Sequence, residues 1–106
     1  MGGEVPVQMT HVKLVTIIAK AVIEEHLIRE IRSLGAKGFT TSEVRGEGSR
    51  GRRLGDAEGA NVLLGCLVSA ETAERTIVAL SERYFEYYAI VVFVQGVSVV
   101  RGDKEL

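Results

Sequence analysis

The sequence has one cysteine, one proline and no tryptophan, and its 13 basic residues nearly balance its 14 acidic ones. A lone cysteine cannot close an internal disulfide, and Cys66 lies in an apolar run, so we expect a buried thiol and a reducing, cytoplasmic location. A net charge of -1 provides no field that would gather nucleic acid, so a nucleic-acid partner is disfavoured. No run approaches the roughly 20 apolar residues of a membrane span, and no signal-peptide pattern opens the chain.

The 106 residues fit a single domain. Residues 1–10 hold two glycines and the only proline and show no sustained period, so we expect a flexible N-terminal tail there. Residues 11–106 then form the folded domain. With 46% hydrophobic and 25% charged residues, the chain has the composition of an ordinary globular protein.

Apolar periodicity divides the domain into six segments. Four are short runs that alternate or are almost continuously apolar, which is typical of strands, and two repeat at intervals of three and four residues, which is typical of helices. The predicted elements are, in order, a strand at 11–18, a helix at 21–34, strands at 39–45 and 61–68, a helix at 70–84 and a strand at 89–100.

The first predicted helix has an apolar stripe, and Gly35 is expected to end it at the C′ position. The stripe consists of Ile23, Leu27, Ile31 and Leu34. The polar residues are expected on a solvated face with weak ion pairs. They are Glu24, Glu25, Arg29, Glu30 and Arg32, and His26 is expected on the same side.

The second predicted helix begins after Ser69, whose side chain is suited to an N-cap. Its apolar stripe consists of Ala73, Ile77, Leu80 and Tyr84. In the first strand, alternation puts Val12, Leu14, Thr16 and Ile18 on one side. In the last strand, Gln95 and Gly96 interrupt the β-branched run, which indicates a bulge or bend.

The predicted order β, α, β, β, α, β is that of an α+β, ferredoxin-like domain. Two right-handed crossovers then place both helices on one face of a four-stranded antiparallel sheet. The strands at 61–68 and 89–100 offer apolar side chains to both faces of the sheet. Because the helices cover only one face, we expect the other face to be buried against further copies of the chain.

The long loop at 46–59 is the first candidate for chemistry, because it holds five glycines and three arginines. Glycines allow the backbone to approach a ligand, successive N–H groups form anion-binding nests, and arginines form paired hydrogen bonds with phosphate oxygens. The arginines are Arg50, Arg52 and Arg53. On composition alone, a solvated connection between two strands remains an equal alternative.

Residues 13–20 (KLVTIIAK) and 35–50 (GAKGFTTSEVRGEGSR) resemble the opening of the PII signal-transduction proteins, in which the long loop is called the T-loop. The matching positions are Gly35, Gly38, Thr40, Glu43, Val44, Gly46 and Gly48. The rest of the chain is similar through the same order of elements. The resemblance implies a homotrimer that binds an adenine nucleotide in the cleft between neighbouring subunits.

The resemblance also implies which residues contact the nucleotide. Thr40 and the backbone near Leu67 match positions that hold the adenine, and Ile18 matches a position that packs on it. The glycines at the base of the T-loop match those that approach the phosphates. The complete expected set is Ile18, Gly38, Thr40, Gly46, Gly48, Ser49, Arg50, Arg53, Leu67, Tyr88 and Arg101.

Three departures from ordinary PII proteins narrow the function. Ser49 and Arg50 stand where those proteins have an Arg-Gln pair whose glutamine helps to bind magnesium and 2-oxoglutarate, so 2-oxoglutarate sensing is not expected. The loop at 46–59 has no tyrosine, so the usual uridylylation site is absent. The residues 84–88 (YFEYY) replace a Gly-Asp-Gly-Lys loop that holds the outer phosphates of ATP, so ATP should lose its advantage over ADP or AMP.

The substituted segments are similar to those of a PII-like subgroup associated with carboxysomes and bicarbonate transporters. One match is Gly48, Ser49, Arg50 and Arg53, and the other is Tyr84, Phe85, Tyr88 and Ala89. The subgroup resemblance implies binding of AMP, ADP or cyclic AMP, and signalling in inorganic-carbon metabolism. That signalling would act through a bicarbonate transporter or carboxysome-related partner, or through bicarbonate as a direct ligand. The cysteine pair at the C-terminus of some transporter regulators is missing here.

Two further hypotheses come from other classes of function. The loop would also suit a pure interaction module that docks on a protein partner without a ligand. Residues 94–101 (VQGVSVVR) imitate the phosphate-binding motif of acylphosphatases, but that motif follows the first strand and leads into a helix. No nucleophile and base pair is apparent, and His11 and His26 have no partners at metal-ligand spacing, so we expect neither an enzyme nor a metal site.

Overall fold

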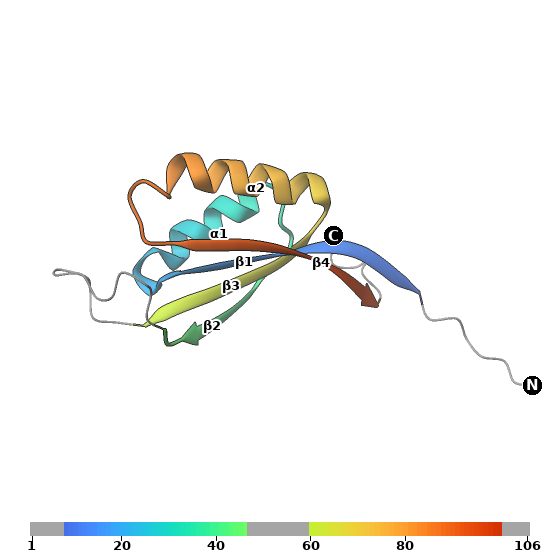
Figure 1. The fold of residues 1–106 in the computed structure, drawn as a ribbon, viewed down its shortest axis with the longest axis horizontal. Helices are drawn as coiled ribbons and strands as arrows, with labels where there is room; N and C mark the ends of the chain where they lie inside the picture. Colours follow the sequence, from blue (N-terminus) through green and yellow to red (C-terminus); the bar gives the residue numbers. More distant parts are fainter. Residues whose placement is uncertain (1–7, 47–59, 101–106) are drawn as a thin grey trace, which may run out of the picture.

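The structure is a computed structural model that describes residues 8–46 and 60–100. Its elements follow the order strand, helix, strand, strand, helix, strand, as the sequence predicts (Figure 1). They are β1 (Met9–Lys20), a 3₁₀ turn η1 (Ala21–Ile23), α1 (Glu24–Ser33), β2 (Thr40–Val44), β3 (Asn61–Val68), α2 (Ala70–Arg83) and β4 (Val91–Val100). β1 begins two residues before residue 11, so Met9 and Thr10 belong to the sheet rather than to a tail.

The four strands form one antiparallel sheet with the order β2-β3-β1-β4. Both helices lie on the same face of this sheet (Figure 1), which confirms the predicted ferredoxin-like α+β class. The pairing of β1 with β4 runs without a break from Met9 opposite Val100 to Ile18 opposite Val91. The expected bulge at Gln95 and Gly96 is therefore wrong, because each of them faces a single residue of β1.

Local sequence signals set the ends of both helices. The hydroxyl oxygen of Ser69 accepts a hydrogen bond from the backbone N–H of Thr72 at 3.2 Å, which confirms the predicted N-cap of α2. Gly35 follows α1 with a φ of 118°, a conformation that favours glycine, and it ends the helix as predicted.

The core lies between the sheet and the two helices. From the sheet it takes alternate residues of β1 and β3, with Val15 opposite Cys66 and Ile17 opposite Leu64. Cys66 is buried, as predicted, and its burial raises the pKa of its thiol. Ile77 was predicted on the buried stripe of α2 but is 38% exposed, because α2 instead buries the smaller residues Thr76 and Ala79.

The opposite face of the sheet has no helix over it within the described residues (Figure 1). Val15 and Ile17 of β1 point into the core. The alternate residues of β1, which the sequence analysis predicted to share one side, therefore lie on the open face. The open face also carries Leu63, Leu67, Val91 and Phe93, and the last two are 55% and 42% exposed. In the described part of the chain, no helix is long and apolar enough to cross a membrane.

Candidate functional site

A cavity of about 440 Å³ opens on the uncovered side of the sheet. Three of the residues predicted from the resemblance line it together: Gly38, Thr40 and Leu67. They come from the segment before β2, from β2 itself and from the end of β3. The other lining residues are Leu14, Thr16, Phe39, Leu63, Gly65 and Cys66. The cavity is thus mostly apolar, with two threonines among its lining residues, which is typical of a small-molecule site.

Gly65 explains why a cavity forms at this position. It pairs with Thr16 on one side and with Thr40 on the other, so it occupies the middle of three adjacent strands. A Cβ atom added there would lie 3.6 Å from Cδ1 of Leu14, an ordinary contact distance. The missing side chain leaves space that its neighbours only partly fill. A glycine inside the apolar run NVLLGCLV was a visible signal for this cavity, and the sequence reasoning did not use it.

Two other predicted residues lie on the route from the cavity toward the end of β2. Ile18 does not line the cavity, but it is half-buried on the same face and pairs with Leu63, which does. Gly46 follows β2, and a Cβ atom added there would have nothing within 4 Å. From Thr40 to Val44 the strand covers roughly 13 Å at about 3.3 Å per residue. This length is comparable to that of an extended nucleoside diphosphate.

The turn between α2 and β4 lies at the same end of the molecule as the start of β3 (Figure 1). It carries four aromatic residues, of which Tyr84 is buried at 9% exposure. Phe85, Tyr87 and Tyr88 are 47%, 72% and 44% exposed. Tyr88, another of the predicted contacts, therefore presents an accessible ring from a turn that is anchored in the core.

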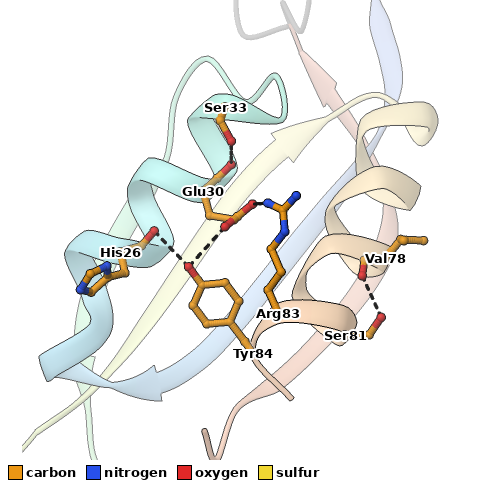
Figure 2. A network of polar contacts seen from close by, with 7 residues as sticks. All are labelled: His26, Glu30, Ser33, Val78, Ser81, Arg83 and Tyr84. Atoms are coloured by element: carbon orange, nitrogen blue, oxygen red, sulfur yellow. Dashed lines mark hydrogen bonds and ion pairs between the residues drawn. The ribbon is translucent and has the colours of Figure 1, made fainter. Parts of the chain in front are cut away.

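A polar network connects α1 to the end of α2 (Figure 2). The carboxylate of Glu30 forms an ion pair with Arg83 and accepts a hydrogen bond from the Tyr84 hydroxyl at 3.4 Å. The same hydroxyl lies 3.4 Å from the backbone carbonyl oxygen of His26. The side chain of Glu30 is only 12% exposed. Its assignment to a solvated helix face was therefore wrong, because Arg83 and Tyr84, 53 and 54 residues away, enclose it.

The Tyr84 phenol gives a prediction for the dependence of stability on pH. Burial raises its pKa above the usual value of about 10, and the negative charge of Glu30 raises it further. The folded state therefore favours the neutral phenol, so this contribution to stability is complete below about pH 10 and is lost as pH rises through the folded pKa. We expect the free energy of unfolding of Tyr84→Phe to fall less than that of the wild type between about pH 8.5 and about pH 10.5. Urea unfolding at the two pH values measures this, and equal losses would contradict it.

A second cavity of about 300 Å³ lies where β1 and β4 extend past the start of α2. His11, Lys13, Ala70 and Ser98 are among its lining residues, and Nδ1 of His11 lies 2.8 Å from the Ser98 hydroxyl. Among the described residues, none of the predicted nucleotide contacts lines this cavity. In the described part of the chain, no three His, Cys, Asp or Glu side chains gather as a metal site would require.

The remaining predicted contacts lie outside the described residues. They are Gly48, Ser49, Arg50, Arg53 and Arg101. The structure thus brings three predicted residues together around one cavity and leaves Ile18, Gly46 and Tyr88 beyond its lining.

Residues 12–104 match the family model described as nitrogen regulatory protein P-II. The chain belongs to the PII family. A search of curated proteins found no match to this sequence.

Solved structures of PII-like proteins have the same fold. A PII-like signalling protein from Thermus thermophilus is 47% identical, with a TM-score of 0.80 over 92% of this chain and 98% of that one. CPII from Thiomonas intermedia, a nitrogen regulatory PII-like protein bound to ADP, AMP and bicarbonate, is 24% identical, with a TM-score of 0.82 over 93% and 97% of the two chains. CPII bound to ADP and bicarbonate is 25% identical, with a TM-score of 0.81 over 93% and 98%.

Membership of the PII family decides the broad class of function. The protein is a PII-like signalling regulator and not an enzyme. The acylphosphatase-like segment at 94–101 falls mainly in β4, an edge strand that pairs only with β1 among the described residues.

Proposed function

We propose that this protein binds an adenine nucleotide, ADP or AMP, with the base in the cavity around Gly65 and the phosphates toward Gly46. The observation that supports this most directly is the lining of the cavity by Thr40 and Leu67, which are expected to hold the adenine, together with Gly38, another expected contact. An apolar cavity with few polar groups suits a purine, which has large faces and a polar edge. The hydroxyl of Thr40 and the backbone of Leu67 would contact that edge.

The phosphates of the nucleotide would be bound by residues in and near the T-loop. Gly46 and Gly48 would let the backbone approach them, and Ser49, Arg50 and Arg53 would donate hydrogen bonds. Ile18 would pack on the base from the neighbouring strand, and Tyr88 would flank the nucleotide. Arg101 would be a further contact of the nucleotide. Binding would change what the T-loop at 46–59 presents to a partner.

The turn after α2 supports a preference for ADP or AMP over ATP. Residues 84–88 contain no lysine or arginine. The cation just before them, Arg83, is already paired with Glu30. A third phosphate would therefore meet the carboxylate of Glu86 and aromatic rings rather than a cation, which disfavours its additional negative charge.

Two points of the proposal concern assembly and signal. The open face of the sheet, with exposed Val91 and Phe93, supports burial against copies of the chain in a homotrimer. Because CPII was solved with ADP, AMP and bicarbonate, we propose bicarbonate as a second ligand of the present protein and a role for it in inorganic-carbon metabolism. Its partner would be a bicarbonate transporter or a carboxysome-related protein, as in the subgroup that the sequence resembles.

The single buried thiol fits a cytoplasmic location.

Isothermal titration of the full chain tests the proposal. AMP, ADP, ATP and cyclic AMP are titrated separately, each with and without bicarbonate. We expect measurable binding of ADP and AMP, weaker binding of ATP, and tighter ADP binding with bicarbonate present. Thermal unfolding gives an independent readout, since a ligand of the native state must raise the apparent stability. If no adenine nucleotide binds in either assay, the alternative of a ligand-free interaction module replaces this proposal.

A further inference from the structure

The turn between α2 and β4 has a single buried anchor. The backbone carbonyl of Tyr84 accepts hydrogen bonds from the N–H groups of Tyr87 at 3.0 Å and Tyr88 at 2.9 Å. The rings of Tyr84 and Tyr88 have centroids 5.7 Å apart and are inclined by 38°, a tilted aromatic pair. Of residues 84–88, only Tyr84 is buried. The orientation of the Tyr88 ring therefore depends on how Tyr84 is held.

Tyr84, which directly follows α2, is also held by α1. Figure 2 shows its hydroxyl directed between the His26 carbonyl oxygen and the Glu30 carboxylate, both on α1. The ion pair of Glu30 with Arg83 binds the same carboxylate to the last residue of α2. The side chain of Glu30 is 12% exposed and that of Arg83 is 60% exposed. Glu30, which accepts the hydrogen bond from Tyr84, is therefore held in place more firmly than Arg83. The ion pair itself contributes little, since one partner is largely solvated.

We infer that Tyr84, held by Glu30, is a positioning residue that presents the Tyr88 ring to the bound nucleotide. This inference rests on the proposed adenylate site, in which Tyr88 is a contact. An exposed tyrosine on an unanchored turn would lose side-chain and backbone freedom when a ligand ordered it, and this loss would weaken binding. The contacts of Tyr84 with Tyr88 and with α1 remove that freedom before the ligand arrives.

A double-mutant cycle on ADP affinity tests this inference. Tyr84→Phe removes the hydroxyl but keeps the ring beside Tyr88, and we expect it to weaken ADP binding about three- to tenfold, the effect of one lost hydrogen bond. Tyr88→Ala should weaken binding about tenfold through the lost aromatic contact. In the double variant, the Tyr84 substitution should add no further loss, because it acts through a ring that is no longer there. If Tyr84 had a purely structural role, the losses of ADP affinity in the two single variants would add in the double variant. Additive losses would therefore overturn the inference.

Substitutions of Glu30 and Arg83 separate hydrogen bonding from charge. Glu30→Gln keeps an oxygen acceptor for the Tyr84 hydroxyl, so ADP affinity should stay within about twofold of wild type. Glu30→Ala removes the side-chain acceptor and leaves the His26 carbonyl oxygen, so it should weaken ADP binding by no more than Tyr84→Phe does. Arg83→Ala should leave the affinity unchanged. If Glu30→Gln weakens binding as much as Glu30→Ala, the positioning role of the hydrogen bond is contradicted.

Ser81→Ala is the matched control, because it removes a hydroxyl of α2 that is hydrogen-bonded to the Val78 carbonyl oxygen and is separate from the turn (Figure 2). It should leave ADP affinity unchanged. If the wild type binds ADP while Tyr84→Phe and Tyr88→Ala bind it equally well, the inference fails and the proposed function stands. If the wild type binds no adenine nucleotide, both fail together.

Discussion

Gly65→Val is expected to weaken ADP binding by about tenfold to a hundredfold while the protein stays folded. Valine suits a strand, and its Cβ would lie 3.6 Å from Leu14, an ordinary contact, so the sheet should accept it. Its two methyl groups would project into the space that we assign to the base, between Thr16 and Thr40. Isothermal titration with ADP, after circular dichroism and size-exclusion chromatography of the variant, measures the effect.

Gly96→Val is a matched control for this change. Gly96 also lies within a strand, and a Cβ atom there would meet only the end of a flexible side chain, Nζ of Lys13, at 3.5 Å. It does not line the cavity around Gly65. ADP binding should therefore be unchanged in the control. Wild-type affinity in a folded Gly65→Val protein would show that the base is bound somewhere else.

Leu64→Ala is expected to cost about 2–5 kcal/mol in the free energy of unfolding, since it removes a fully buried side chain and leaves a cavity in the core. Leu64 lies in β3 opposite Ile17, where the sheet faces the helices. Urea unfolding followed by circular dichroism measures the loss. Wild type and variant are compared at one subunit concentration, because assembly into oligomers makes stability depend on concentration.

Val78→Ala shows what a comparable truncation costs at the surface. Val78 is 53% exposed on α2, so its loss should change the free energy of unfolding by less than about 0.5 kcal/mol. A loss of the same small size in Leu64→Ala would mean that the core between sheet and helices is not closely packed.

The sequence predicted the element order and the ends of the helices because these depend on local signals. β-branched runs, Ser69 before α2 and Gly35 after α1 act through nearby backbone. Predictions from sequence patterns were less reliable for features that depend on tertiary packing, such as which side chains of a helix are buried. Ile77 fits the helical period, yet Thr76 and Ala79 are the buried residues on either side of it and Ile77 is partly exposed at the surface.

The candidate site was predictable only through resemblance. Gly38, Thr40 and Leu67 are separated by up to 29 positions in the sequence, and the cavity joins them only because β2 pairs with β3. Glu30 could not be placed between two helices from its own segment, since Arg83 and Tyr84 approach it from the other end of the chain. The position of Gly65 in three paired strands depends on register, which local patterns do not specify across a long connection.

The position of β1 in the sheet has a consequence for the order of events during synthesis. β1 is made first, but it lies between β3 and β4, and Met9 pairs with Val100. During translation the emerging chain can pair β1 with β3 and cover the sheet with α1 well before β4 leaves the ribosome. Until then β1 keeps one unpaired edge, and a free strand edge favours association with other chains. Because the pairing of β1 with β4 joins segments far apart in the sequence, we expect this pairing to form late and the domain to fold slowly for its size.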